Sequence, residues 1–300
     1  MRFGIQPFEL TSIGNLVSEN GKFDLNRLSA PSIVRRCIKE GFQVIELGLD
    51  LGYVIPGSIN AKAVEVLKMI KNSEKISYTV HLPLWAVEPA SPNEFIRKAS
   101  VEVLADAVRL CEPLEPEAYV VHATGALAAE FSRLEIGELY KEYIASEMTS
   151  LAEQSIKGLL SLTGLRPEKL AVETVEFPYK YMKRLIDKFG TSICCDTGHI
   201  IAGYPGNYTV TGFLEEFIDR VIDIHLHDAY RIEKERGVKI QKDHLPLGEG
   251  KLPIKEVFSF LERHNYSHPI VFELTLPQAL QSLQVIREKY PKALEKPRSK

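Results

Sequence analysis

Seven short apolar runs of this 300-residue chain each contain one side chain able to ligate a metal. They are VIELGL with Glu46, YTVHLP with His81, YVVHAT with His122, LAVETV with Glu173, ICCDTGH with Asp196, DIHLHD with His225 and IVFELT with Glu273. Desolvating one charge costs several kcal/mol, so a lone buried carboxylate is unfavourable. Ligand-type groups placed alike along the chain therefore indicate one shared site.

Several carboxylates cannot share a site without a counter-charge. Two like charges about 4 Å apart repel by roughly 4 kcal/mol at an effective dielectric constant of about 20. The seven runs contain no Lys or Arg, so a divalent cation is the simplest partner. Imidazole combined with carboxylate suits zinc, manganese or iron better than calcium.

The positions of the histidines support the same interpretation. Six of the eight lie at predicted strand ends or in the connections that follow: His81, His122, His199, His225, His227 and His244. For His264 and His268 we expect structural roles. A single histidine such as His81 would ordinarily be a core residue, but the clustering predicts metal ligands. DHLPLGEG (243–250) could hold His244 over the site; alternatively, it is only a turn before the next helix.

Strand-like runs alternate with amphipathic helical patterns along the chain. The predicted strands are 2–8, 44–49, 78–84, 118–124, 170–176, 192–198, 223–229 and 269–275. The predicted helices are 28–40, 60–72, 94–111, 138–161, 178–189, 212–220, 253–264 and 277–289. Eight such repeats predict a single (β/α)₈ TIM barrel, with the active site at the C-terminal face of the strands. We expect one domain over 1–290 and a polar, frayed tail over 291–300.

Two connections at that face are long. Residues 199–211 follow the sixth predicted strand, and residues 229–252 follow the seventh. Long loops in compact domains are usually functional or disordered. We expect the second to act as a lid or a substrate clamp.

Composition excludes few classes of function. A net charge of −3 disfavours nucleic acid as a partner without excluding it. No apolar run approaches the roughly 18 residues that span a bilayer, and MRFGIQPF is typical of a strand, so we expect a cytoplasmic protein with no membrane partner. The four cysteines show no metal spacing and are expected to be buried thiols. The sequence leaves a homo-oligomer open.

HLP, VVHAT, VET, CDTGH, HLHDA, DHLPLGEG and FEL, in this order, resemble the xylose isomerase-like barrels, from Phe3 to about Leu276. This superfamily includes endonuclease IV-type enzymes and sugar or sugar-phosphate isomerases and epimerases. The resemblance to the isomerase and epimerase branch implies one divalent metal on Glu173, Asp196, His225 and Glu273. It also implies proton transfer by the two glutamates and a substrate contact from Arg231.

The resemblance to the endonuclease IV branch implies two further zinc ions. Their ligands match His81, His122, His199 and His244, with Glu173 bridging two metals. One further aspartate of that pattern is replaced here by Lys242. Either Asp243 could substitute or Lys242 could fill part of the space, so the third metal stays open.

Two enzymatic hypotheses follow, with a non-catalytic barrel as a third. The first is a hydrolase of a phosphodiester or phosphoester with two or three Zn or Mn ions, because bound metals lower the pKa of water from 15.7 to about 7. It would act on a small nucleotide- or sugar-containing substrate, cobamide-type cofactors included, rather than duplex DNA. The alternative is a one-metal sugar isomerase or epimerase with Glu173 and Glu273 as acid and base. The expected substrate-binding residues are Glu46, Trp85, Tyr204, Arg231 and Lys242.

Overall fold

The computed structural model describes residues 1–8, 18–19, 22–23, 28–134, 136–233 and 239–295. Eight parallel strands form a closed barrel in the order β1-β12-β9-β8-β7-β6-β5-β4, and β1 pairs with both β12 and β4. This confirms the predicted TIM barrel. The barrel strands are β1 (Arg2–Ile5), β4 (Val44–Gly48), β5 (Ser77–His81), β6 (Tyr119–Val121), β7 (Leu170–Glu173), β8 (Ser192–Asp196), β9 (Val221–Leu226) and β12 (Pro269–Phe272).

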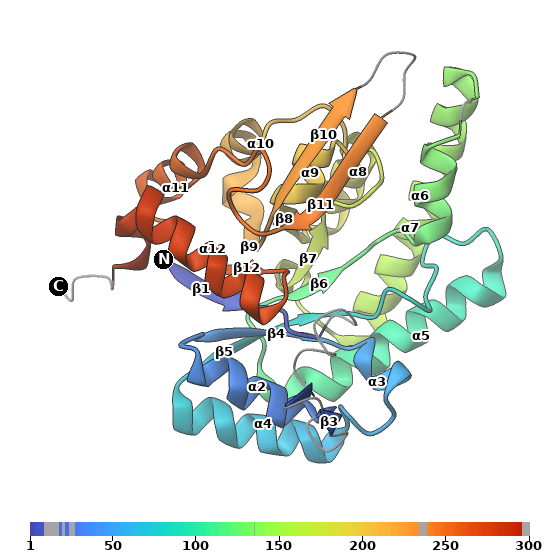
Figure 1. Ribbon diagram of the computed structural model, residues 1–300. Helices are drawn as coiled ribbons and strands as arrows, with labels where there is room; N and C mark the ends of the chain where they lie inside the picture. The colour runs from blue at the N-terminus through green and yellow to red at the C-terminus, as the bar shows by residue number, and fades with distance from the viewer. Residues whose placement is uncertain (9–17, 20–21, 24–27, 135, 234–238, 296–300) are drawn as a thin grey trace.

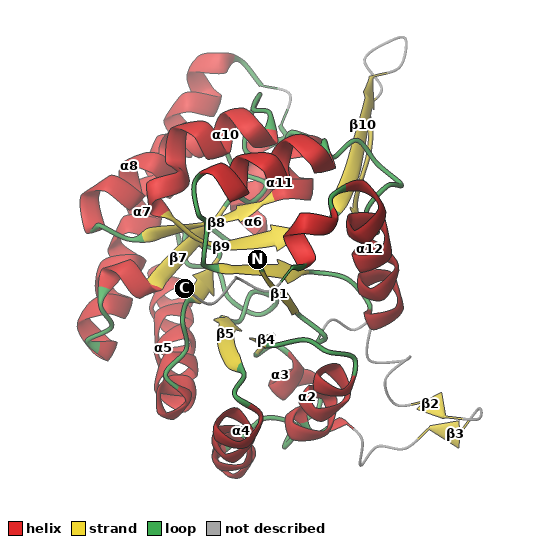
Figure 2. Cartoon of the chain, turned by 90° about the vertical axis from the view of Figure 1, so that its left-hand side faces the viewer, coloured by secondary structure: helices red, strands yellow, loops and turns green. Residues whose placement is uncertain are grey.

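Helices cover the outside of the barrel (Figure 2). They are α2 (Ala30–Lys39), α3 (Leu51–Val54), α4 (Ala61–Glu74), α5 (Glu94–Cys111), α6 (Ala126–Ser132), α7 (Glu138–Thr163), α8 (Tyr179–Phe189), α9 (Thr197–Ala202), α10 (Val210–Phe217), α11 (Ile254–Arg263) and α12 (Leu276–Lys289). The main apolar core lies between strands and helices, as alternating strand side chains require. None of the described helices is both long and apolar enough to cross a membrane.

Inside the barrel, small side chains lie beneath the polar groups. Ala118, Val120, Ala171 and Cys194 form a separate buried cluster. Ala171 and Cys194 each precede a strand-end carboxylate by two residues, so they share its inward face. Their small volume leaves the centre of the barrel open enough for the longer acidic side chains above them.

Helix caps fix two of the strand ends. The Asp196 carboxylate accepts the backbone N–H of His199 at 2.6 Å and starts α9. Thr275 forms a capping box with Gln278 at the start of α12, two residues after Glu273. Capping satisfies N–H groups that a helix start leaves unpaired. Each cap therefore also holds the turn that carries a predicted ligand.

Three predictions about connections need correction. Half of 229–252, expected as a loop, forms the antiparallel pair β10 (Asp228–Glu233) and β11 (Lys239–Leu245), which rises above the barrel (Figure 1). His199 lies on α9 rather than in an open loop. The tail begins later than expected, because Pro291–Leu294 forms a 3₁₀ turn. Within this turn Ala293 is buried, and its carbonyl accepts a hydrogen bond from the Met1 amino group. Residues 296–300 lie outside the described range.

Asp228 ties the base of the hairpin to the return segment. Its fully buried carboxylate accepts the backbone N–H groups of Ala229 at 2.9 Å, Gly248 at 2.9 Å and Leu252 at 2.8 Å. Gly250 packs against it so closely that a Cβ would lie 2.3 Å from Asp228 Oδ1. One carboxylate thus organises three segments of the hairpin base.

We expect Asp228→Ala to lower the free energy of unfolding by about 3 kcal/mol or more, because each buried donor left unpaired costs about 1–3 kcal/mol. Urea unfolding measures this. Asp106→Ala is the matched control, since the ion pair of Asp106 with Arg109 is exposed and its loss should change stability by less than about 0.5 kcal/mol. Equal effects of the two substitutions would contradict the role of Asp228 in holding the hairpin base.

Candidate metal centre

Four strand ends bring together one set of ligands. Glu173, Asp196, His225 and Glu273 place four ligand atoms within 4.8 Å of one another, and all four side chains are buried. The His225 Nδ1 atom lies 3.3 Å from Glu273 Oε2, 3.6 Å from Glu173 Oε1 and 3.8 Å from Asp196 Oδ2. We call these four residues the core cluster.

A second group shares Glu173 with the core cluster. His81 Nε2 and His122 Nε2 lie 3.2 Å and 3.0 Å from Glu173 Oε2, while Glu173 Oε1 faces the core cluster. The two imidazole rings meet edge to face, with centroids 5.2 Å apart. We call His81 and His122 the outer pair. The two oxygens of Glu173 thus point to two different groups of ligands, as in a bridging carboxylate.

His199 and His244 also border the core cluster. His199 Nδ1 is 3.6 Å from Asp196 Oδ2, and His244 Nε2 is 3.4 Å from Glu273 Oε2. His244 owes its position to a bulge in the β10–β11 pair, where two residues of β11 oppose one of β10. Its φ of 51° is unusual for a residue other than glycine. Bulges near active sites commonly redirect a side chain, and this one turns His244 toward the centre.

The core cluster passes a test for a metal. Among the described residues, Glu173 Oε1, His225 Nδ1 and Glu273 Oε2 are buried atoms without a hydrogen bond of acceptable geometry. Buried polar groups are nearly always satisfied, so three orphans that face one another indicate a missing partner. Two carboxylates and an imidazole suit a transition-metal ion.

The second nitrogen of three imidazoles faces an oxygen acceptor. These contacts are His81 Nδ1 to Leu82 O at 2.9 Å, His225 Nε2 to Glu46 Oε1 at 3.0 Å and His244 Nδ1 to Asp243 Oδ1 at 3.2 Å. An acceptor requires a proton on the nitrogen that it contacts. The other nitrogen then points its lone pair at the centre, which is how metal-bound histidines are held.

His227, which was not among the predicted ligands, has the opposite arrangement. Its Nδ1 accepts the backbone N–H of His244 at 2.9 Å, so its proton must lie on Nε2, 2.9 Å from Asp196 Oδ2. His199, His227 and His244 lie close enough together to hold an ion. His227, however, donates its Nε2 proton to Asp196 and offers no lone pair to such an ion. Its spacing from His225 could have revealed it, since residues two apart on a strand share a face.

The acidic and imidazole groups perturb one another strongly. Burial alone would lower the pKa of His81 and of His199. Glu173 instead raises the pKa of His81 to about 9, and Asp196 together with Glu173 raises that of His199 to about 9. Burial would raise the pKa of Glu173 and Glu273, yet adjacent histidines hold both well below their usual range. Protons on imidazole thus provide the positive charge when no metal does so.

The expected substrate-binding residues do not form one group. Glu46 is fully buried, lies 3.0 Å from His225 Nε2 through its Oε1 atom, and accepts a hydrogen bond from Thr79 Oγ1 at 2.8 Å, so it can orient His225. Tyr204 lies at the rim, its ring 5.4 Å from that of His199 and its hydroxyl bonded to Asp243. Trp85 is half-exposed in the segment after β5.

Arg231 and Lys242 both lie on the hairpin. Arg231 lines a cavity of about 350 Å³ with α9 and residues 203–208, where it packs against Gly203. The described lining of that cavity includes no member of the core cluster. Lys242 is exposed and pairs across the hairpin with Tyr230. Asp243, the proposed substitute ligand, instead contacts the outer nitrogen of His244.

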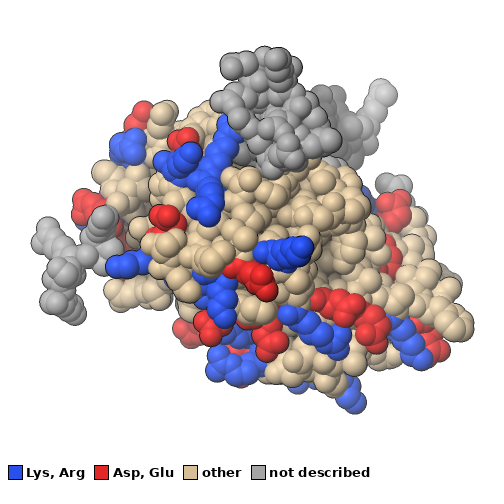
Figure 3. Space-filling model, turned by 90° about the horizontal axis from the view of Figure 1, so that it is seen from below, with Lys and Arg blue, Asp and Glu red and all other residues tan. Residues whose placement is uncertain are grey.

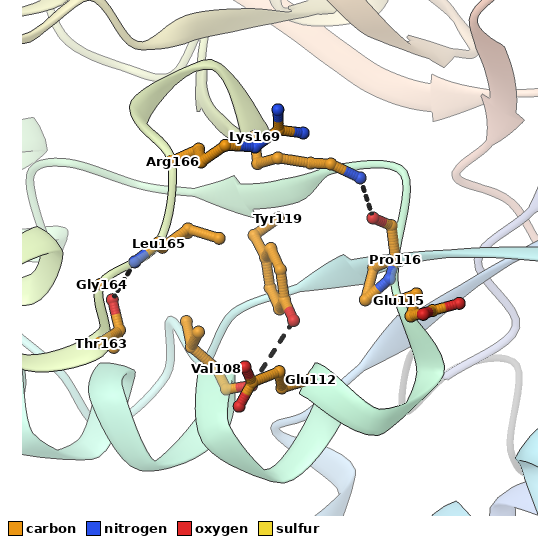
Figure 4. Close-up of a pocket in the computed structure, with 10 residues that line it drawn as sticks. All are labelled: Val108, Glu112, Glu115, Pro116, Tyr119, Thr163, Gly164, Leu165, Arg166 and Lys169. Carbon is orange, nitrogen blue, oxygen red and sulfur yellow. Dashed lines mark hydrogen bonds between the residues drawn. The ribbon is translucent and has the colours of Figure 1, made fainter.

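A further cavity, of about 230 Å³, lies at the opposite end of the barrel (Figure 4). Its walls come from residues that precede β6 and β7, and Lys169 Nζ donates to Pro116 O there at 2.6 Å. The N-terminal face of a TIM barrel usually serves stability rather than catalysis. The ligand-type groups gather instead at the other face, as predicted for an active site.

The fold and these clusters define a TIM barrel with a candidate metal centre at the C-terminal ends of its strands. The chain belongs to the xylose isomerase-like TIM barrel family, whose model matches residues 34–289. The uncharacterized protein MJ1311 of Methanocaldococcus jannaschii is 26% identical over 250 residues, covering 77% of this chain and 75% of that protein. A probable endonuclease 4 of Alkaliphilus oremlandii is 24% identical over 260 residues, covering 78% and 85%.

The fold is also similar to that of a D-tagatose 3-epimerase-like protein of known structure. The TM-score is 0.70 at 22% identity, over 97% of this chain and 98% of that one. The chain is thus similar to proteins with both kinds of name. The likeness supports the fold, and the choice between hydrolysis and isomerisation depends on the site itself.

We expect the free energy of unfolding of the metal-free protein to fall as pH rises from about 6.5 to about 9. His81 and His199 have pKa values raised from 6.5 to about 9 in the folded state, so the stability they add is complete below pH 6.5 and lost through pH 9. Urea unfolding in a chelator measures it. Zinc should reduce the fall, because the ion replaces these protons; a flat profile without metal would contradict the assignment.

We expect His227→Phe to weaken metal binding about 10- to 100-fold without changing the number of ions bound, because Asp196 loses an orienting donor. Phenylalanine keeps the ring that stacks on His244 at 4.2 Å. Chelator competition and elemental analysis measure the two quantities, with His264→Phe, directly after α11, as the control. Loss of one ion per chain would instead identify His227 as a ligand.

Proposed function

We propose that the protein is a divalent-metal-dependent hydrolase of small phosphodiesters or phosphoesters. The observation that supports this most is the outer pair, because His81 and His122 both contact the oxygen of Glu173 that the core cluster leaves free. A one-metal isomerase has no need of these two imidazoles. A hydrolase that places two ions side by side needs such a bridge between them.

The residues divide between two ion positions. His81, His122 and Glu173 would hold one ion, and the core cluster would hold a second, of zinc or manganese. Bound divalent ions supply a polarised phosphoryl oxygen and a water of lowered pKa. His199 and His244 border the second position and could contribute a third ion or hold an oxygen of the substrate. Glu46 keeps His225 oriented from behind.

A small substrate is favoured over duplex DNA. Duplex binding depends on neutralising phosphates with Lys and Arg, whereas the net charge here is −3. On the face seen in Figure 3, basic and acidic side chains lie next to one another rather than in a basic stripe. The proposed substrates are therefore small nucleotide- or sugar-containing esters, including cobamide-type cofactors.

The alternative is a one-metal sugar or sugar-phosphate isomerase or epimerase. It is supported by the complete core cluster, in which Glu173 and Glu273 face a common centre and could act as acid and base. The position of Arg231 in a separate cavity gives this alternative less support than its spacing in the sequence implies.

We expect elemental analysis of the loaded protein to find at least two divalent ions per chain. His81→Ala should remove one ion and reduce hydrolysis of bis(p-nitrophenyl) phosphate by more than about 100-fold, because one of the two ions that would stabilise the phosphoryl oxygens is lost. His264→Ala is the matched control and should retain both. A single ion held by the core cluster at full occupancy, or unchanged turnover in His81→Ala together with epimerisation of a ketose, would favour the alternative.

A further inference from the structure

A cavity of about 210 Å³ opens directly beside the candidate metal centre. Two of its lining residues are His122 and His199, whose ring nitrogens lie 3.0 Å and 3.3 Å from the two oxygens of Glu173. The others come from the segments after β5, β6 and β7 and from α6. A group in this cavity would therefore lie next to the candidate metal centre.

The lining is largely apolar. Five of its ten described lining residues are Leu84, Val87, Ala126, Ala129 and Val175, and none of the ten is Lys or Arg. The one carboxylate is Glu176, which is paired with Arg133. An anionic group placed here would lose its water without gaining a cation, which costs several kcal/mol.

The start of α6 offers no anion site either. The Glu88 carboxylate already accepts the backbone N–H of Leu127, at 3.2 and 3.3 Å from its two oxygens. It lies so close to Gly125 that a Cβ there would be 2.0 Å from Glu88 Oε2. The Glu88 carboxylate thus already accepts the backbone N–H that could otherwise bind a phosphate.

We propose that this cavity binds an uncharged aromatic or similarly flat apolar group carried by the ester substrate, next to its phosphoryl group. A dry apolar cavity of about 150 Å³ is enough to hold benzene, so about 210 Å³ accommodates a substituted single ring or a small fused pair. The assignment rests on the proposed hydrolase function. It narrows the substrate class to phosphoesters with an apolar ring on one side.

The test compares phenylphosphonate with methylphosphonate, which differ only in the ring. Isothermal titration calorimetry of the metal-loaded protein gives both dissociation constants without turnover. We expect phenylphosphonate to bind about 10-fold more tightly or better, from burial of the ring. Equal dissociation constants would overturn the proposal.

Substitutions on α6 locate the effect. Ala129→Phe should fill the cavity and reduce the preference to less than about 3-fold, with methylphosphonate binding unchanged. Ala126→Phe is the second variant, since Ala126 lines the cavity but is exposed and its substitution need not disturb folding. Glu130→Phe, exposed on the same helix and outside the described lining, is the control and should keep the full preference. Retention of the preference in both cavity variants would overturn the proposal.

The two proposals fail in different ways. If the wild-type protein hydrolyses phosphodiesters but shows no preference for phenylphosphonate, only the cavity assignment is wrong. If it shows the preference and the cavity variants remove it, but neither phosphodiesters nor phosphomonoesters are hydrolysed, the apolar site is supported and the hydrolase function is wrong.

Discussion

The convergence of three buried carboxylates at one end of the barrel is the constraint on which the rest of the site depends. Glu173, Asp196 and Glu273 come from strand ends that the parallel barrel brings together, and no barrel strand from β4 onward carries a cation to balance them. Without a positive partner the barrel mouth would be strongly destabilised. The imidazoles, and in our proposal the metal ions, supply that charge. Glu173 is central because each of its oxygens faces a different set of partners.

A comparison within the barrel shows that partners, and not burial, decide the state of an acid. Asp223 lies on β9 two residues before His225 and is fully buried, like Glu173. Burial together with the nearby charge of Glu46 raises the pKa of Asp223 well above its usual value. For Glu173 the adjacent histidines reverse the effect of burial. The same barrel therefore raises the pKa of one buried acid below the site and lowers those of Glu173 and Glu273 within it.

Much of this could be predicted from the sequence because strands have a simple period. Alternation along a strand places Glu173 and Ala171, or His225 and Asp223, on one face whatever the tertiary details. The strand ends then define the core cluster and the outer pair. The hairpin could not be predicted in the same way, since the charged residues of 229–252 gave no apolar alternation. The bulge that turns His244 inward depends on a backbone conformation, φ 51°, that histidine adopts only when its surroundings impose it.

The same bulge explains why the position of Asp243 could not be predicted from the sequence. A carboxylate one residue from a predicted ligand seems able to replace a missing aspartate at Lys242, yet in a strand neighbouring residues point to opposite faces. The bulge places Asp243 against the outer nitrogen of His244 and the hydroxyl of Tyr204. There it fixes the tautomer of His244 instead of facing the centre. His227 in turn takes one oxygen of Asp196 through its Nε2 proton. Asp243 and His227 thus contact neighbouring candidate ligands, and the two ion positions of our proposal are those that meet at Glu173.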